Sequence, residues 1–106
     1  MASGKDKFGR PVVVVTGIGV VTSLAAGKSD NWAKLTAGES GIRAISRFPT
    51  EGLRTRIAGT IDYLGPQTTS VGLSERFADL VAEEAIAESG IGSRGEFPGP
   101  LFLAVQ

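Results

Sequence analysis

The chain has 106 residues, of which 42% are apolar and 21% are charged, a composition typical of one small folded domain and not of a disordered chain. Its 11 basic and 11 acidic residues cancel, so no net charge draws nucleic acid or an anionic membrane to it. There is no cysteine and no histidine, which excludes disulfides, thiolate metal sites and a cysteine nucleophile within these residues.

The amino terminus, residues 1–10, is polar and contains glycine. It offers no apolar stretch long enough for a signal peptide or a membrane span. We therefore expect a cytoplasmic protein in which this polar tail precedes a folded segment at residues 11–106.

Residues 12–16 form an unbroken run, VVVVT. Because the run shows no polar alternation, it predicts a central strand that is covered on both faces, as in a sheet between helices. Gly17 and Gly19 follow, and we interpret them as positions where the chain passes tightly against another backbone.

A dinucleotide-binding loop is the alternative for these glycines, because the fingerprint G-x-G-x-x-G also follows a strand directly. Here Thr22 occupies the third glycine position, and no helix starts at once to face a phosphate. We therefore expect no nucleotide cofactor and assign no cofactor-binding residue.

A short helix is predicted over residues 31–36, with Ser29 or Asp30 as its N-cap and Gly38 at the left-handed position that ends helices. Residues 39–53 combine glycines, a proline and isolated apolar side chains, which indicates an irregular connection.

Residues 56–61 predict a second strand, in which Ile57 and Ile61 face the same way and Gly59 marks a bulge or a close contact. A turn-rich stretch at residues 64–72 follows, with Gly65 and Pro66 in it.

The longest helix is expected to run from Ser74 to Ser89 and to end at Gly90. At about 100° per residue, its apolar side chains cover about half of the helix, opposite three charged ones. The apolar half consists of Phe77, Ala78, Val81, Ala82, Ala85 and Ile86, and the charged side of Arg76, Asp79 and Glu83. So broad and alanine-rich a face predicts close packing inside a layered protein.

The last part of the chain is expected to be a polar link, residues 91–99, and then the start of a third strand, residues 101–105. Compact domains rarely end inside a buried strand, since their termini lie at surfaces. We therefore expect Gln106 to be a break point and not the natural end of the fold.

The charges are unevenly placed, because residues 1–60 hold nine basic residues against four acids. A solvated surface is one explanation. The other is a basic docking patch for an acidic partner, formed by Arg43, Arg47, Arg54 and Arg56.

No residue of the chain is assigned a catalytic or metal-binding role. The hydroxyls of Thr16, Thr22 and Ser23 have no base in this chain to activate them. Trp32 shares a helix face with Leu35 and is interpreted as a packed anchor, not as a platform for substrate.

Three stretches together resemble the opening of a β-ketoacyl-acyl-carrier-protein synthase, a condensing enzyme of the thiolase superfamily. They are VVVVTGIGVVTSLAAGKSDNWAKLTAGESGIRAISRFP, RIAGTIDYLGP and AEEAIAESGI, and they occur in the order and spacing of that family. The resemblance runs from about residue 11 to residue 105.

The resemblance implies an α/β protein, namely the amino-terminal part of a five-layered α-β-α-β-α thiolase-like fold that is incomplete in this chain. It also implies a homodimer that condenses an acyl thioester with malonyl-acyl carrier protein in fatty-acid elongation, with loss of carbon dioxide. In this family a cysteine carries the acyl chain and two histidines assist, as oriented donors do for developing negative charge. All three lie downstream of this segment, so these residues alone are not expected to catalyse the reaction.

Two departures from the family are visible. Ser23 and Ala25 stand where members usually have proline and glycine. The stretch GPQTTSVGLSERF, before and into the long helix, lacks the lysine and arginine cluster that carrier-protein-dependent members often have there. Because carrier proteins are acidic, this puts the usual docking mode in question.

Two alternatives to a catalytic subunit stay open. One is a non-catalytic partner subunit that resembles chain-length factors, which share this opening but lack the nucleophile. The other is a free-standing binding module derived from such a fragment, which is expected to unfold cooperatively as a monomer.

Overall fold

The computed structural model describes residues 4–65, 69–93 and 95–104. Four elements follow one another in these residues: α1 (Lys28–Thr36), β1 (Ile42–Ala44), β2 (Ile57–Gly59) and α2 (Ser70–Ser89). The segment is therefore mixed α/β, as expected.

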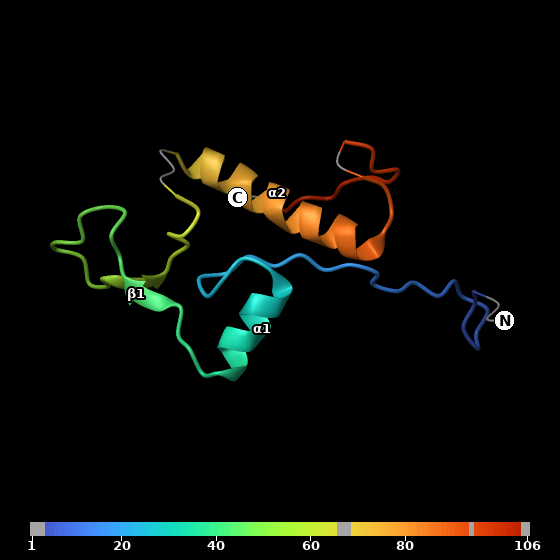
Figure 1. Cartoon of the computed structure of the whole chain (residues 1–106), viewed down its shortest axis with the longest axis horizontal. Helices are drawn as coiled ribbons and strands as arrows, with labels where there is room; N and C mark the ends of the chain where they lie inside the picture. Colours follow the sequence, from blue (N-terminus) through green and yellow to red (C-terminus); the bar gives the residue numbers. More distant parts are fainter. Residues whose placement is uncertain (1–3, 66–68, 94, 105–106) are drawn as a thin grey trace.

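The two strands pair antiparallel as a short hairpin. Ile42 lies opposite Gly59, and Ala44 lies opposite Ile57. Figure 1 shows the extended amino-terminal segment running alongside α2, with α1 on its other side and the hairpin at the end of the molecule away from the N-terminus.

The chain is elongated and buries little of its own apolar surface. Its radius of gyration is 18.3 Å, against about 13 Å for a compact domain of about 100 residues. Its accessible surface is 8540 Å², whereas a compact monomer of this mass exposes about 5,600 Å². In the described part of the chain, Ala25 is the one buried hydrophobic residue. The accessible surface in excess of the compact value is as large as the area that two proteins bury in an obligate interface.

The predicted central strand at residues 12–16 is wrong. The run is extended and pairs with no other strand in the described residues, and Val13 is 90% exposed. A strand needs a neighbour for its backbone N–H and C=O groups, and among the described residues this run finds one only at Val12, whose N–H donates to Gly4 O at 3.0 Å.

Helix α1 forms where it was expected, but its predicted cap is wrong. The N-cap is Gly27, which has no side chain to offer, and the helix begins at Lys28, before both Ser29 and Asp30. Gly38 has a φ of 77°, which confirms the left-handed position after the helix end. Trp32 is 67% exposed, so its interpretation as a packed anchor is also wrong, because no described segment covers this face.

Helix α2 starts one turn earlier than predicted. The hydroxyl of Thr69 accepts the N–H of Gly72 at 3.0 Å, so Thr69 caps the helix and Ser74 lies inside it. Part of the predicted turn region, residues 66–68, lies outside the described residues. Gly90, with a φ of 71°, ends the helix as predicted. The six apolar side chains are half-buried and the three charged ones are exposed, which confirms the two-sided helix.

Two predictions about connections were also wrong in part. Residues 39–53 contain β1, a strand of three residues that exists only in its pairing with β2. Residues 101–104 are exposed and form no strand, while the remainder of that predicted strand lies outside the described residues. The second predicted strand is confirmed at its centre, as β2.

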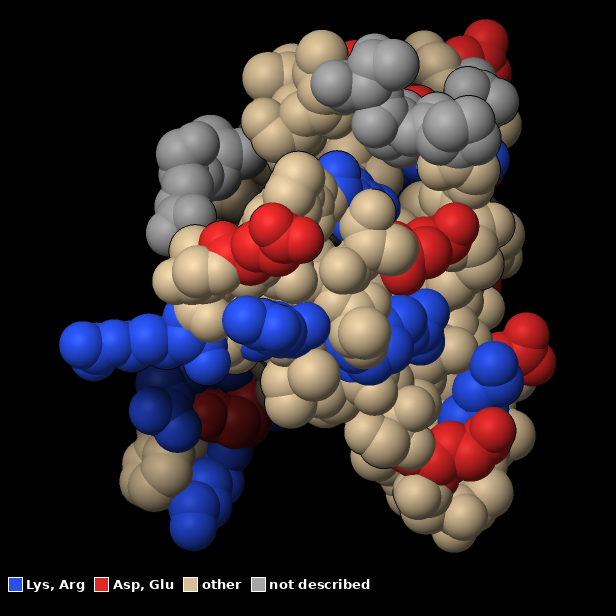
Figure 2. All heavy atoms as spheres, turned by 90° about the vertical axis from the view of Figure 1, so that its left-hand side faces the viewer, with Lys and Arg blue, Asp and Glu red and all other residues tan. Residues whose placement is uncertain are grey.

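Figure 2 shows the hairpin end of the molecule, where Lys and Arg side chains form a band across the face and Asp and Glu side chains flank it. Of the helices that the structure describes, neither is both long enough and apolar enough to cross a membrane.

Candidate functional site

The glycine turn lies directly on the backbone of α2. A Cβ atom at Gly17 would stand less than 3.0 Å from the carbonyl oxygen of Ala85, and one at Gly19 equally close to that of Val81. Side chains cannot occupy such positions, so both glycines are needed for a close backbone passage. This confirms the structural interpretation of the two glycines, because they face the middle of α2 and not the start of a helix.

Glu84 of α2 holds the chain on either side of this crossing. Its carboxylate accepts the backbone N–H groups of Val20 and Lys28, each at 2.9 Å. The Lys28 N–H belongs to the first turn of α1, so a carboxylate from the other helix supplies the cap that Gly27 lacks. The N–H groups of Lys28 and Val20 hold the pKa of the Glu84 carboxyl below its usual range. Lys28 is also ion-paired with Glu88, one turn along α2.

The loop after the glycines is held through its carbonyl oxygens by side chains from three parts of the chain. The Tyr63 hydroxyl donates to Thr22 O at 2.7 Å, and the Arg43 guanidinium donates to Ser23 O at 2.7 Å. The Lys34 ammonium donates to Leu24 O at 3.1 Å. Partial burial raises the pKa of the Tyr63 hydroxyl, although the nearby Arg43 charge opposes this.

Asn31 completes this arrangement from α1. Its amide nitrogen donates to Ala25 O at 2.8 Å and to Gly27 O at 2.7 Å, and its oxygen accepts the Thr22 hydroxyl. Four successive carbonyls, residues 22–25, therefore have side-chain donors. We call this segment the clamped loop.

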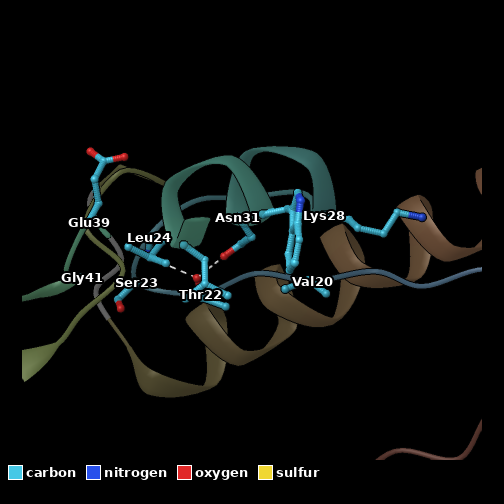
Figure 3. Close-up of a pocket in the computed structure, with 10 residues that line it drawn as sticks. Val20, Thr22, Ser23, Leu24, Lys28, Asn31, Glu39 and Gly41 are labelled. Carbon is cyan, nitrogen blue, oxygen red and sulfur yellow. Dashed lines mark hydrogen bonds between the residues drawn. The ribbon is translucent and has the colours of Figure 1, made fainter. Parts of the chain in front are cut away.

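A pocket of about 590 Å³ lies between the clamped loop and α1. Figure 3 shows the Thr22 and Asn31 side chains pointing toward one another across its floor, with Glu39 and Gly41 at one side. Trp32 and Leu35 add apolar surface from α1. The remaining lining residues are Val20, Ser23, Leu24 and Lys28.

The pocket assembles no reactive centre from the residues that line it. The Ser23 hydroxyl lies against Gly41, where a Cβ would overlap it, and no histidine or cysteine exists in the chain to activate it. The Thr22 hydroxyl is used in its bond to Asn31. In residues 4–65, 69–93 and 95–104, no group of three acidic, histidine or cysteine side chains lies close enough together to hold a metal ion.

Glu84 and Tyr63 are structural residues that the sequence analysis missed. A signal for Glu84 existed, because at about 100° per residue it falls beside Phe77, at the edge of the apolar half of the helix. An acid in that position indicates a polar partner on the packed face. Tyr63 stands in an irregular segment after β2, and its sequence position carried no comparable signal.

The fold and the site together define the segment as a mixed α/β scaffold. In it a glycine turn crosses α2, and the clamped loop precedes and contacts α1. The chain matches the family model for the β-ketoacyl synthase amino-terminal domain over residues 10–97. It therefore belongs to the β-ketoacyl synthase family, which confirms the resemblance found in the sequence.

Relatives of several kinds are similar to the chain. The 3-oxoacyl-[acyl-carrier-protein] synthase 2 of Coxiella burnetii is 43% identical over 70% of this chain and 18% of its own length. The ketoacyl synthase α subunit of the tetracenomycin polyketide synthase of Streptomyces glaucescens is 40% identical over 74% of this chain and 20% of its own length. The β subunit from the same organism is 35% identical, over 74% and 21%. The chain thus spans about a fifth of the length of the curated relatives it matches.

Proposed function

We propose that the chain forms the amino-terminal opening of a 3-oxoacyl-acyl-carrier-protein synthase that works in fatty-acid elongation. The reaction is the decarboxylative condensation of an acyl thioester with malonyl-acyl carrier protein. The family match supports the reaction class, and the 43% identity to the Coxiella enzyme supports the fatty-acid assignment.

The role of this segment is that of a scaffold. Residues 11–106 are the opening of the thiolase-like body, and residues 1–10 are a tail in front of it. The chain has no cysteine or histidine, so the acyl-carrying nucleophile and its histidine donors come from the rest of the synthase.

One observation carries the proposal, namely that the glycine turn is pressed onto α2 while the apolar run before it lies open. Val13, Val14 and Val15 are exposed and unpaired, although nothing in their chemistry favours contact with water. We infer that the other strands and helices of a five-layered synthase cover this run, and that the synthase is a homodimer.

A chimera tests the proposal. In it, this chain replaces the aligned opening of the Coxiella synthase, and condensation is measured with malonyl-acyl carrier protein and an acyl primer. We expect the chimera to be active, and Gly19→Ala to lower its activity at least about tenfold, because the new methyl group meets the backbone of Val81.

The matched control is Gly52→Asn. Gly52 has a φ of +79° with nothing within 4 Å, and asparagine tolerates that conformation, so activity is expected to stay unchanged. A chimera that folds as the parent enzyme does, yet neither decarboxylates nor condenses, contradicts the proposed function.

A non-catalytic partner subunit is the second candidate, and the 35% identity to a β subunit favours it. The residue at the family's cysteine position, in the reading frame that carries this chain, separates the two. Cysteine there supports the catalytic synthase, and glutamine supports the partner subunit.

A further inference from the structure

Four arginines lie on the β1–β2 hairpin and its connecting loop. Arg43 is in β1, Arg47 follows it, and Arg54 and Arg56 precede β2. Glu51 and Asp62 are the two acids of the same stretch, so this end of the molecule has a surplus of positive charge. The band of Lys and Arg in Figure 2 lies on this face.

Two of these arginines are held by the structure itself. Arg47 is ion-paired with Asp62 at 3.3 Å, and Arg43 lies 3.9 Å from the same carboxylate. Both also donate to backbone carbonyls, Arg43 to Ser23 and Arg47 to Ile61. The Asp62 carboxylate is therefore already paired with these two arginines. Its pKa is held below the usual range by the Thr60 hydroxyl first and by Arg47 next.

Arg54 and Arg56 are different, because their guanidinium groups bind no acid or carbonyl oxygen within the described part of the chain. Both are exposed, and neither has a side-chain hydrogen bond or an ion pair to any described residue. Their backbone is nevertheless positioned, since Ile45 donates its N–H to Arg56 O at 2.9 Å, and Leu53 to Thr50 O at 3.1 Å. They form a pair of available cations at a defined place.

The start of α2 offers no such pair. Between residues 65 and 77 the sequence has one basic residue, Arg76. Complementary charges on two proteins speed and orient their encounter, so the surface with available cations is the one an acidic partner finds first.

We propose that Arg54 and Arg56, supported by Arg43 and Arg47, form the docking surface for an acidic acyl carrier protein. The proposal rests on the proposed function for the choice of partner. It places the approach of the carrier at the hairpin itself and not at the first turn of α2.

A binding experiment on the chimeric synthase tests this without catalysis. A fluorescently labelled acyl carrier protein is titrated with the chimera, and the anisotropy gives Kd at about 0.05 M and about 0.5 M salt. We expect the double variant Arg54→Glu/Arg56→Glu to raise Kd about tenfold at low salt and about twofold at high salt, where exposed charges are screened.

Two single variants are the controls, with circular dichroism to verify that each keeps the wild-type fold. Arg76→Glu reverses a charge at the start of α2, and Lys7→Glu does so near the amino terminus. Each is expected to leave Kd within about twofold. The proposal is overturned by absent binding at low salt, by an unchanged Kd in the double variant, or by an equal loss in Arg76→Glu. Equal affinity for a polyglutamate peptide of matched charge also overturns it, because a carrier-specific surface would not treat them alike.

The chimeric synthase separates this proposal from the proposed function. In an active chimera, we expect the double variant to raise KM for the carrier-bound substrate and to leave kcat unchanged. An active chimera with an unaltered KM rejects the docking surface alone. A chimera that folds as the parent enzyme does but is inactive rejects the proposed function, while its binding data still decide whether the arginines hold the carrier.

Discussion

Replacing Glu84 by glutamine tests whether one carboxylate joins α1 to α2. The side chain keeps its length but loses its charge, so one of its two backbone hydrogen bonds loses an acceptor and the other becomes neutral. Hydrogen bonds to charged groups contribute about 1.5–3 kcal/mol, and neutral ones about 1 kcal/mol. The lower end of this range gives about 2 kcal/mol for the two bonds together. Because Glu84 is only half-buried, water screens its charge, and we expect a smaller loss of about 1.4 kcal/mol, which is about tenfold in an equilibrium constant.

Amide hydrogen exchange at Val20 and Lys28 measures this loss locally, because protection there reports opening of the contact with Glu84. In Glu84→Gln, we expect both protection factors to fall about tenfold at neutral pH. The folded-state pKa of Glu84 is lowered from 4.5. Its contribution is therefore complete above that ordinary value and is lost as the pH falls through the folded-state pKa.

The same acid-induced loss of protection should be absent from Glu84→Gln, since the variant has no proton to gain there. Glu75→Gln is the matched control on the same helix, because the Glu75 side chain is exposed and makes no hydrogen bond or ion pair with a described residue. If Glu84→Gln keeps wild-type protection, or if Glu75→Gln loses as much, the carboxylate does not join the helices as described.

Two other substitutions test the elements around the site. Thr69→Ala removes the cap of α2 and should cost about 1 kcal/mol, seen as a lower midpoint of helix melting by circular dichroism; an unchanged midpoint contradicts the cap. Tyr63→Phe removes the donor to Thr22 O and should cost about 0.5–1 kcal/mol. Its direct measure is the carbonyl carbon shift of Thr22 by NMR, which should move while that of Leu24, bonded to Lys34, stays in place.

The local features of the fold were accessible from sequence because they depend on residues close together in the chain. Gly38 and Gly90 end the two helices as predicted, since a left-handed position after a helix favours glycine wherever the helix lies. The two-sided pattern of α2 and the centre of β2 followed from periodicity in the same way. The start of α2 does not follow from sequence in this way, because Thr69 and Ser74 are both suitable caps and only the path of the chain selects between them.

The features that failed depend on partners far away in the sequence. The valine run has every property of a buried strand, but strand formation requires a neighbouring strand, and the described residues provide none along it. Trp32 has the character of an anchor, yet an anchor needs a surface to pack against.

Sequence alone therefore determined the family, the sites where helices end and the need for glycine at positions 17 and 19. Only the tertiary structure decided what those glycines cross, that Glu84 caps the helix Gly27 cannot, and which two of the four hairpin arginines keep their charge available. The physical reason is that propensity and periodicity act over a few residues. The Glu84 carboxylate, by contrast, finds its N–H donors across more than 50 residues of chain, where the glycine turn and the first residue of α1 reach α2.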